Sequence, residues 1–254
     1  MAALVIAVGA LAVPLTYLTA RHLLDERRAR LATLLVALSP DVLLFGVTSP
    51  DVVYLTLGLL IAWPMAAGRV ALGAGATAAV SFFAWSLPAI AAWAAILAAV
   101  RRRWRQALTI CLAVAGALIA WYLAAWALFG FDVVATLEAT ESVYRVGVAS
   151  TRPYWYWLFG SPVIFLLFLG LPILWLALRA LGERRPLALA FFAVIAIAAV
   201  GGFTKAETER IWLFLAPLGC FAAAAVLRER HLRPVLAVLA VQALATEVLL
   251  DTVW

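Results

Sequence analysis

The chain has 254 residues, of which 67% are hydrophobic and 13% are charged, and its mean hydropathy is +1.08. An ordinary globular domain carries roughly a quarter of charged residues, so this composition leaves no room for a separate soluble domain and indicates a polytopic membrane protein. The formal net charge of +6 does not predict a nucleic-acid partner, because the basic residues gather in short connectors between apolar stretches.

Fifteen of the nineteen basic residues lie in five such connectors. The positive-inside rule assigns these connectors to the cytoplasm, where they orient the protein and can contact anionic lipid headgroups. They are Arg21, Arg27, Arg28 and Arg30; Arg69; Arg101, Arg102, Arg103 and Arg105; Arg179, Arg184 and Arg185; and Arg228, Arg230 and Arg233.

Alternation across the bilayer then predicts an all-α bundle of about ten transmembrane helices, in a single domain over residues 1–254. The class is helical because lipid cannot satisfy backbone polar groups and no segment alternates like a barrel strand. The shorter spans between residues 52 and 100 are expected to tilt, pair or be shielded by neighbours. The predicted spans are 1–20, 31–47, 52–67, 70–84, 86–100, 107–128, 162–181, 187–203, 211–227 and 234–250.

Nine of the thirteen acidic residues fall on the predicted outer side, together with Arg145, Arg152, Lys205 and Arg210. The positive-inside rule barely constrains acids, so their accumulation needs another cause, and a polar active face is one candidate. The acids are Asp41, Asp51, Asp132, Glu138, Glu141, Glu207, Glu209, Glu247 and Asp251.

The first outer feature is the segment 38–55, in which Ser-Pro-Asp occurs twice. Pro40 is expected to end or kink the preceding helix, and Ser49–Asp51 to begin the next one. Two interpretations of Asp51 stay open. It either caps the helix, or it faces an outer cavity with Asp41, where a carboxylate can act as a general base or bind a sugar hydroxyl or a metal ion.

The second outer feature is a long, partly helical loop at 129–161. Its first part predicts a helix capped by Asp132, with Glu141 and Arg145 paired four residues apart, lying on the membrane surface. Its second part is Arg152 followed by Pro153 and four aromatic residues. These aromatics form either an interfacial belt or a wall for a sugar ring or lipid headgroup, with Arg152 facing a phosphate. They are Tyr154, Trp155, Tyr156 and Trp157.

The third outer feature is the charged stretch TKAETER before the apolar run IWLFLAPL. It is either an interfacial turn held by ion pairs or the edge of a phosphate-facing cavity. In the second interpretation Lys205 and Arg210 hold the phosphate, because both stay protonated at neutral pH, and Glu207 and Glu209 contact the sugar or lipid.

The cysteines and histidines predict no metal site. Cys111 and Cys220 lie far apart inside apolar segments and are interpreted as packing residues. His22 and His231 sit in Arg-rich connectors, where a solvated or lipid-facing role is expected. No cofactor is identifiable, and a divalent metal has no support in the sequence.

The order of the features carries a resemblance. Five features follow one another along the chain: an Arg-rich turn before LATLLVALSPDVLLFG, an acid opening the next span in TSPDVVYL, a hairpin ending in an Arg cluster, a long aromatic outer loop, and ERIWLFLAPL. This order resembles that of the membrane-embedded type C glycosyltransferases. More narrowly, it is similar to actinobacterial integral membrane members related to the protein mannosyltransferase and aminoarabinose transferase group.

Such enzymes pass a sugar from a polyprenyl-phosphate carrier to an acceptor outside the membrane. The resemblance implies a multi-pass protein of the bacterial cytoplasmic membrane with an outward active face and a cell-envelope glycan, lipid or protein as acceptor. It implies that Arg210 helps to bind the donor phosphate and that Asp51 matches the acid heading an early span. The family's principal catalytic aspartate lies in a first outer loop, and we expect that loop and the span before it to be absent from this chain.

Two alternatives stay open. A non-catalytic relative would bind the lipid carrier without transferring sugar. A small-molecule transporter would need ionisable residues or broken helices at mid-membrane, and the central parts of the predicted spans contain almost none.

Overall fold

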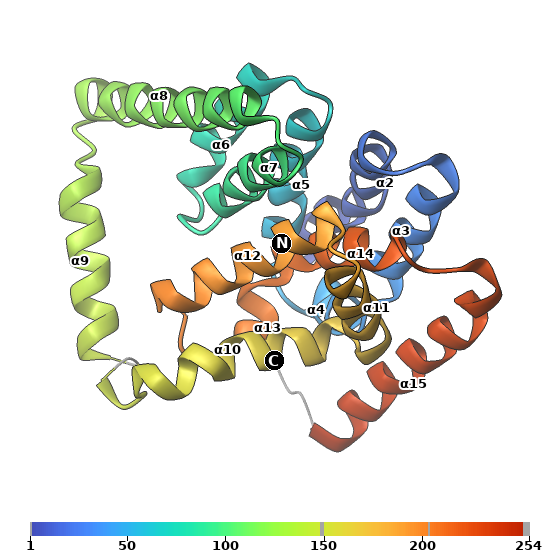
Figure 1. Cartoon of the computed structure of the whole chain (residues 1–254). Coiled ribbons are helices and arrows are strands. Elements are labelled where there is room, and N and C mark those ends of the chain that lie inside the picture. Colours follow the sequence, from blue (N-terminus) through green and yellow to red (C-terminus); the bar gives the residue numbers. More distant parts are fainter. Residues whose placement is uncertain (1, 148–149, 203, 251–254) are drawn as a thin grey trace.

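The computed structural model describes residues 2–147, 150–202 and 204–250 (Figure 1). Within these ranges the chain forms helices joined by turns and short connectors, without any strand. The predicted all-α class is confirmed.

The chain order of the α-helices follows the apolar stretches of the sequence. They are α1 (Ala2–Ala10), α2 (Ala12–Leu23), α3 (Glu26–Leu38), α4 (Pro40–Thr48), α5 (Val52–Ala66), α6 (Val70–Ser81), α7 (Pro88–Val100), α8 (Trp104–Phe129), α9 (Val133–Val146), α10 (Tyr154–Leu169), α11 (Leu171–Gly182), α12 (Pro186–Gly201), α13 (Thr208–Ile211), α14 (Ala216–Ala224) and α15 (Leu232–Leu250). Two short 3-10 helices, η2 (Leu213–Leu215) and η3 (Glu229–His231), precede α14 and α15.

Three helical segments within the described residues are long and apolar enough to cross a membrane: Ala3–Leu23, Trp104–Phe129 and Glu229–Leu249. The number rises to five if each of two bent helix pairs counts as one span. The predicted ten spans are therefore not confirmed. The remaining apolar helices have 10–17 residues, fewer than the roughly 20 that a perpendicular span needs.

The short helices are packed inside the bundle. All residues of α14 are buried, and it lies against α3, α11 and α12. Gly219 permits this close packing, because a side chain there would meet Leu169 at 2.7 Å and Phe191 at 2.9 Å. By contrast, α8 and α15 leave most of their apolar surface exposed, as helices that face lipid do.

Two helix breaks meet in the core. The chain bends by 53° between α3 and α4 and by 113° between α10 and α11. The second bend occurs at Gly170, whose φ of +116° disfavours any residue with a side chain. A Cβ there would lie 2.4 Å from Leu239 and 3.0 Å from Pro40, so the two breaks are in contact.

The bend at Gly170 corrects the prediction of one continuous span over 162–181. Pro172 follows the break and has no backbone N–H to donate. Gln242 of α15 satisfies polar groups on both sides of the break. Its side chain accepts a hydrogen bond from the Leu171 N–H (2.8 Å) and donates one to the Leu167 carbonyl (2.7 Å).

The helix predicted in the first part of the loop 129–161 is confirmed as α9. The Asp132 carboxylate caps it by accepting from the N–H groups of Val134 and Ala135, and Glu141 pairs with Arg145 at 2.5 Å. None of its described residues is buried, and it runs crosswise between α8 and α10 (Figure 1).

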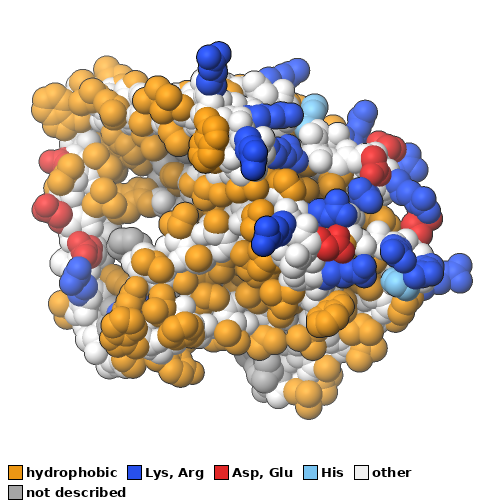
Figure 2. All heavy atoms as spheres, viewed as in Figure 1, with side chains coloured by type: hydrophobic (Ala, Val, Ile, Leu, Met, Phe, Trp, Pro, Cys, Tyr) orange, Lys and Arg blue, Asp and Glu red, His pale blue; other side chains and the backbone are white. Residues whose placement is uncertain are grey.

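Basic side chains are unevenly distributed over the molecule. On the face shown in Figure 2, most Lys and Arg side chains lie at the centre and right, with some acidic side chains among them, and further acidic side chains lie at the left edge over α9. We call the end with α9, the C-terminus of α8 at Phe129 and the C-terminus of α12 at Gly201 the α9 end. We call the opposite end, with the connector 101–103, the Arg-rich end.

Candidate functional site

Asp51 precedes α5 but does not cap it, because its side chain accepts no hydrogen bond from the first turn of that helix. Its Oδ2 instead accepts from the Ser49 hydroxyl at 2.5 Å and lies 3.3 Å from Nε of Arg210. The helix-cap interpretation of Asp51 is therefore wrong, and its carboxylate pairs with Arg210 instead.

Arg210 lies in α13 between two carboxylates. Besides Asp51, it contacts Glu207, whose Oε2 accepts from Nη2 at 2.6 Å. The side chains of Arg210 and Asp51 are 25% and 15% exposed, so solvent screens this ion pair only in part. We call Asp51, Glu207 and Arg210 the acid–arginine cluster.

Arg152 and Lys205 come together through the main chain. Nη1 of Arg152 donates to the Lys205 carbonyl at 2.6 Å, and the guanidinium lies 5.5 Å from the centre of the Trp157 ring. The connector 204–210 thus touches Arg152 near its beginning and Asp51 near its end. All the predicted phosphate-binding cations belong to this connector or contact it.

Two side chains that the sequence interpretation missed hold this connector in place. The Ser161 hydroxyl donates to the Thr204 carbonyl at 2.9 Å, and the Thr204 hydroxyl accepts from the Trp212 indole at 3.2 Å. Ser49 was predicted only to begin the next helix, and its hydrogen bond to Asp51 was missed although both belong to one Ser-Pro-Asp motif. Ser161 and Thr204 lie 43 positions apart, so no local sequence pattern predicts their contact.

The four aromatic residues do not share one surface, because successive residues of a helix point about 100° apart. The Tyr154 hydroxyl donates to the Val200 carbonyl at 2.7 Å and anchors α10 to α12. Trp155 and Tyr156 are 74% and 64% exposed. Trp157 alone contacts Arg152 among these four. Of the four rings, that of Trp157 lies beside Arg152, and the contact of these aromatics with a sugar or lipid headgroup stays a prediction.

Glu209 points into the protein and is 8% exposed. It belongs to α13, which packs against α10. Burial raises the pKa of Glu209 above its ordinary value, and the negative charge of Glu207 raises it further. Glu209 is thus buried in the packing of α13 against α10, whereas Glu207 is more exposed and pairs with Arg210.

Asp41 does not join this site. It is fully buried at the start of α4, beside the helix break at Pro40. Asp41 precedes Ser49 by eight positions along α4, a rise of about 12 Å. The expectation that Asp41 and Asp51 face one outer cavity is wrong, because the bend at Pro40 turns Asp41 into the core.

Asp41, predicted near the outer face, is instead an ionisable group inside the bundle. Its Oδ1 accepts from the Val42 N–H at 2.8 Å, and its Oδ2 has no hydrogen-bond partner within the described residues. Ser39 lies close by, but its hydroxyl donates to the Val36 carbonyl at 3.1 Å. Cys220 of α14 is buried close to Asp41.

The described residues contain no group of three His, Cys, Asp or Glu side chains that could hold a metal ion. Both cysteines are free, with Cys111 exposed and Cys220 buried. The cysteines therefore lie apart, on the surface and in the core.

Comparison of the chain with protein-family models, curated proteins and solved structures finds no match. The function is therefore argued from the geometry of the site. The acid–arginine cluster supplies a carboxylate that can accept a proton and a guanidinium that can stabilise developing negative charge.

Proposed function

We propose that this protein is a glycosyltransferase-like membrane protein that takes a sugar from a polyprenyl-phosphate donor and passes it to a cell-envelope acceptor. The observation that carries the proposal is the ion pair between Asp51 and Arg210. One residue opens an early helix and the other belongs to ERIWLFLAP, and both are positions that the resemblance selects. Their contact supports a shared role for two segments that are distant in the sequence.

The proposed reaction is a displacement at the anomeric carbon of the sugar. The acceptor oxygen forms a bond to this carbon, and the bond from the carbon to the phosphate oxygen breaks, leaving its electron pair on the lipid phosphate. Asp51 takes the proton of the acceptor, and Arg210 stabilises the departing phosphate. In this proposal Nε of Arg210 faces Asp51, and the phosphate replaces Glu207 as the acceptor for the terminal nitrogens of the guanidinium.

The neighbouring cations extend the proposed donor site. Arg152 is held by the Lys205 carbonyl and by the Trp157 ring, which fixes its guanidinium beside the connector. A multi-pass topology in the bacterial cytoplasmic membrane, of about ten spans including tilted and short helices, is part of the proposal. The positive-inside rule then turns the α9 end outward, toward the acceptor.

The test is transfer of radiolabelled sugar from polyprenyl-phosphate donors in membranes that contain the chain. Arg210→Ala is expected to lower the rate by about a hundredfold, the cost of removing one charge-stabilising donor. Arg145→Ala is the matched control, because Arg145 is 74% exposed and pairs only with its helix neighbour Glu141 within the described residues. Equal rates for the two variants would contradict the proposed role.

Binding separates catalysis from recognition. Crosslinking of a photoreactive polyprenyl phosphate to the chain, weakened by Arg210→Ala, would support the donor site even without turnover. Binding without transfer would favour the non-catalytic carrier-binding alternative. Transfer that survives Asp51→Asn would remove Asp51 as the base.

A second candidate function, proton-coupled transport of a small solute, is favoured by Asp41. Discontinuous helices with a buried acid at the break are a recurring feature of transporters. Here the breaks at Pro40 and Gly170 touch, and Asp41 lies beside them. Solute uptake into proteoliposomes driven by a pH gradient, lost in Asp41→Asn but kept in the exposed control Asp25→Asn, would support it. Uptake equal in all three proteins would exclude this role for Asp41.

A further inference from the structure

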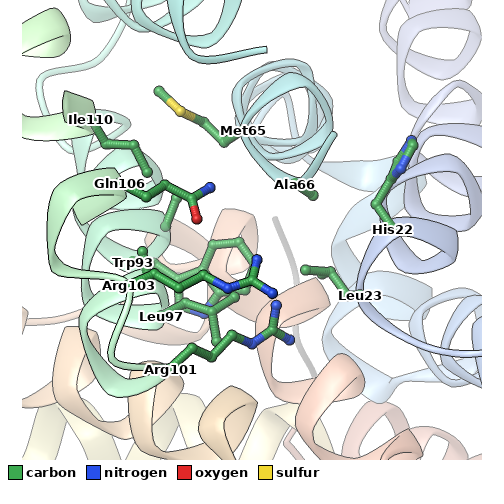
Figure 3. A pocket seen from close by; sticks show the side chains of 12 residues that line it. His22, Leu23, Met65, Ala66, Trp93, Leu97, Arg101, Arg103, Gln106 and Ile110 are labelled. Atoms are coloured by element: carbon green, nitrogen blue, oxygen red, sulfur yellow. The ribbon is translucent and has the colours of Figure 1, made fainter. Parts of the chain in front are cut away.

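A cavity of about 80 Å³ opens at the Arg-rich end (Figure 3). Its walls come from the C-terminal ends of α2, α5 and α7, the connector 101–103 and the first turns of α8. Met65 and Ala66 bring the end of α5 to this cavity, whereas the other end of α5 begins beside Asp51. Since 15 residues of helix rise by about 22 Å, the cavity is remote from the acid–arginine cluster.

The polar side chains around this cavity are able to donate hydrogen bonds, and its lining contains no Asp or Glu. Figure 3 shows the guanidinium groups of Arg101 and Arg103 side by side, extending in the same direction toward Leu23, with Gln106 above them. A cavity surrounded by donors and free of carboxylates is complementary to an anion.

The two arginines repel one another. Neither forms an ion pair within the described part of the chain, unlike Arg210 at the other end. Burial lowers the pKa of Arg101, and the nearby charge of Arg103 lowers it further. An anion between the two guanidinium groups would turn this repulsion into two attractions.

Trp93 supplies an independent observation. It lines the cavity from α7, is 1% exposed and packs on Phe221 with ring centroids 6.4 Å apart. Its indole N–H has no hydrogen-bond partner within the described residues. A buried donor without an acceptor is costly, so this group calls for an acceptor that the chain itself does not provide.

We propose that this cavity binds a phosphate group, either in the headgroup of an anionic lipid or as free phosphate. Several acceptor oxygens of a phosphate match the forks of Arg101 and Arg103 and the single N–H of Trp93. Apolar lining residues such as Leu97 and Ile110 suit the part of a lipid next to its phosphate. Basic pockets between helices at a membrane surface are a known form of headgroup site.

The experiment uses the full chain in a neutral maltoside detergent. One arm titrates short-chain phosphatidylglycerol, with phosphatidylcholine as its uncharged-headgroup comparison, and measures binding by native mass spectrometry. The other arm adds inorganic phosphate at constant ionic strength and measures the shift of the thermal unfolding midpoint. The double variant Arg101→Gln/Arg103→Gln is compared with Arg102→Gln/Arg105→Gln. The control removes the same charge from the same end of the protein, at one exposed position in the connector and one in the first turn of α8, both outside the cavity lining.

The cavity pair is expected to weaken binding by about tenfold or more and the control pair by less than about threefold. Trp93→Phe, which keeps the charge and removes the N–H, is expected to weaken it by about fivefold. Binding in the lipid arm alone identifies a headgroup site, and binding in both arms identifies a site for any accessible phosphate. Equal losses in the two double variants, or no binding in either arm, would overturn the proposal.

Discussion

Arginines from other segments lie near both ends of α5, in opposite electrostatic environments. At its start, Arg210 lies 3.3 Å from Asp51 and 2.6 Å from Glu207. At its end, Arg101 and Arg103 extend into one cavity whose lining contains no acid. The first arrangement neutralises charge within the chain and stabilises the fold, whereas the second stores repulsion that an external anion can relieve. The partner, and not the residue type, therefore decides what an arginine does here.

The strongest test of this comparison removes the cation of the acid–arginine cluster. Arg210→Ala leaves Asp51, only 15% exposed, without its ion partner and is expected to lower the free energy of unfolding by about 2 kcal/mol. Asp51→Ala is expected to cost less, about 1 kcal/mol, because Arg210 keeps Glu207. Thermal or denaturant unfolding in detergent measures both. Arg145→Ala, on an exposed pair, should change the free energy of unfolding by less than about 0.5 kcal/mol. If Arg210→Ala lowers it no more than Arg145→Ala does, the ion pair of Arg210 with Asp51 does not stabilise the fold.

The second test concerns Glu209, the buried acid of the α9 end. Its raised pKa means that the folded chain holds the proton more tightly than the unfolded chain does. Its contribution to stability is therefore fully present below the ordinary Glu value of 4.5 and is lost as the pH rises through the folded-state pKa.

Glu209→Gln is thus expected to stabilise the protein at pH 8, on the order of 1 kcal/mol, and to leave it unchanged near pH 4. Unfolding midpoints of the two proteins across this range measure the difference. Glu138→Gln on the exposed face of α9 is the control and should show no such trend. A constant offset at every pH would mean that Glu209 acts through packing rather than charge.

Local features of this fold could be predicted from the sequence. The helical class follows from the apolar stretches, and the Asp132 cap and the Glu141–Arg145 pair follow from short-range spacing. The break at Gly170 had a signal in Gly-Leu-Pro, but its apolar surroundings favoured a continuous helix. Its 113° bend is stabilised by Gln242, 71 positions from Leu171, which no local pattern reveals.

The candidate site was predicted in its parts rather than in its geometry. Arg210 and Asp51 were selected by motif order, and their pairing required the folded chain. Asp41 shares its Ser-Pro-Asp motif with Asp51, so sequence alone could not separate a core position from a site position. The connector 101–103 was assigned to the cytoplasm as one of several connectors able to contact anionic lipid headgroups, but the sequence does not show that Trp93 and Gln106 lie beside it.

The smallest expected effect gives the most specific test, because the change in unfolding free energy has the opposite sign from that of Arg210→Ala. Without anions, Arg101→Gln removes one of two repelling charges and is expected to raise the free energy of unfolding by about 0.5 kcal/mol. Arg105→Gln, an exposed change in the first turn of α8, should leave it nearly unchanged. Phosphatidylglycerol should then reverse the order of stability of the wild-type chain and Arg101→Gln, since the wild-type chain keeps both cavity guanidinium groups for the phosphate and the variant keeps one. Unfolding midpoints in maltoside at low salt, with and without this lipid, measure the reversal. If Arg101→Gln destabilises the lipid-free chain, Arg101 has a partner within the protein, and the two ends of α5 do not differ in the way argued from their geometry.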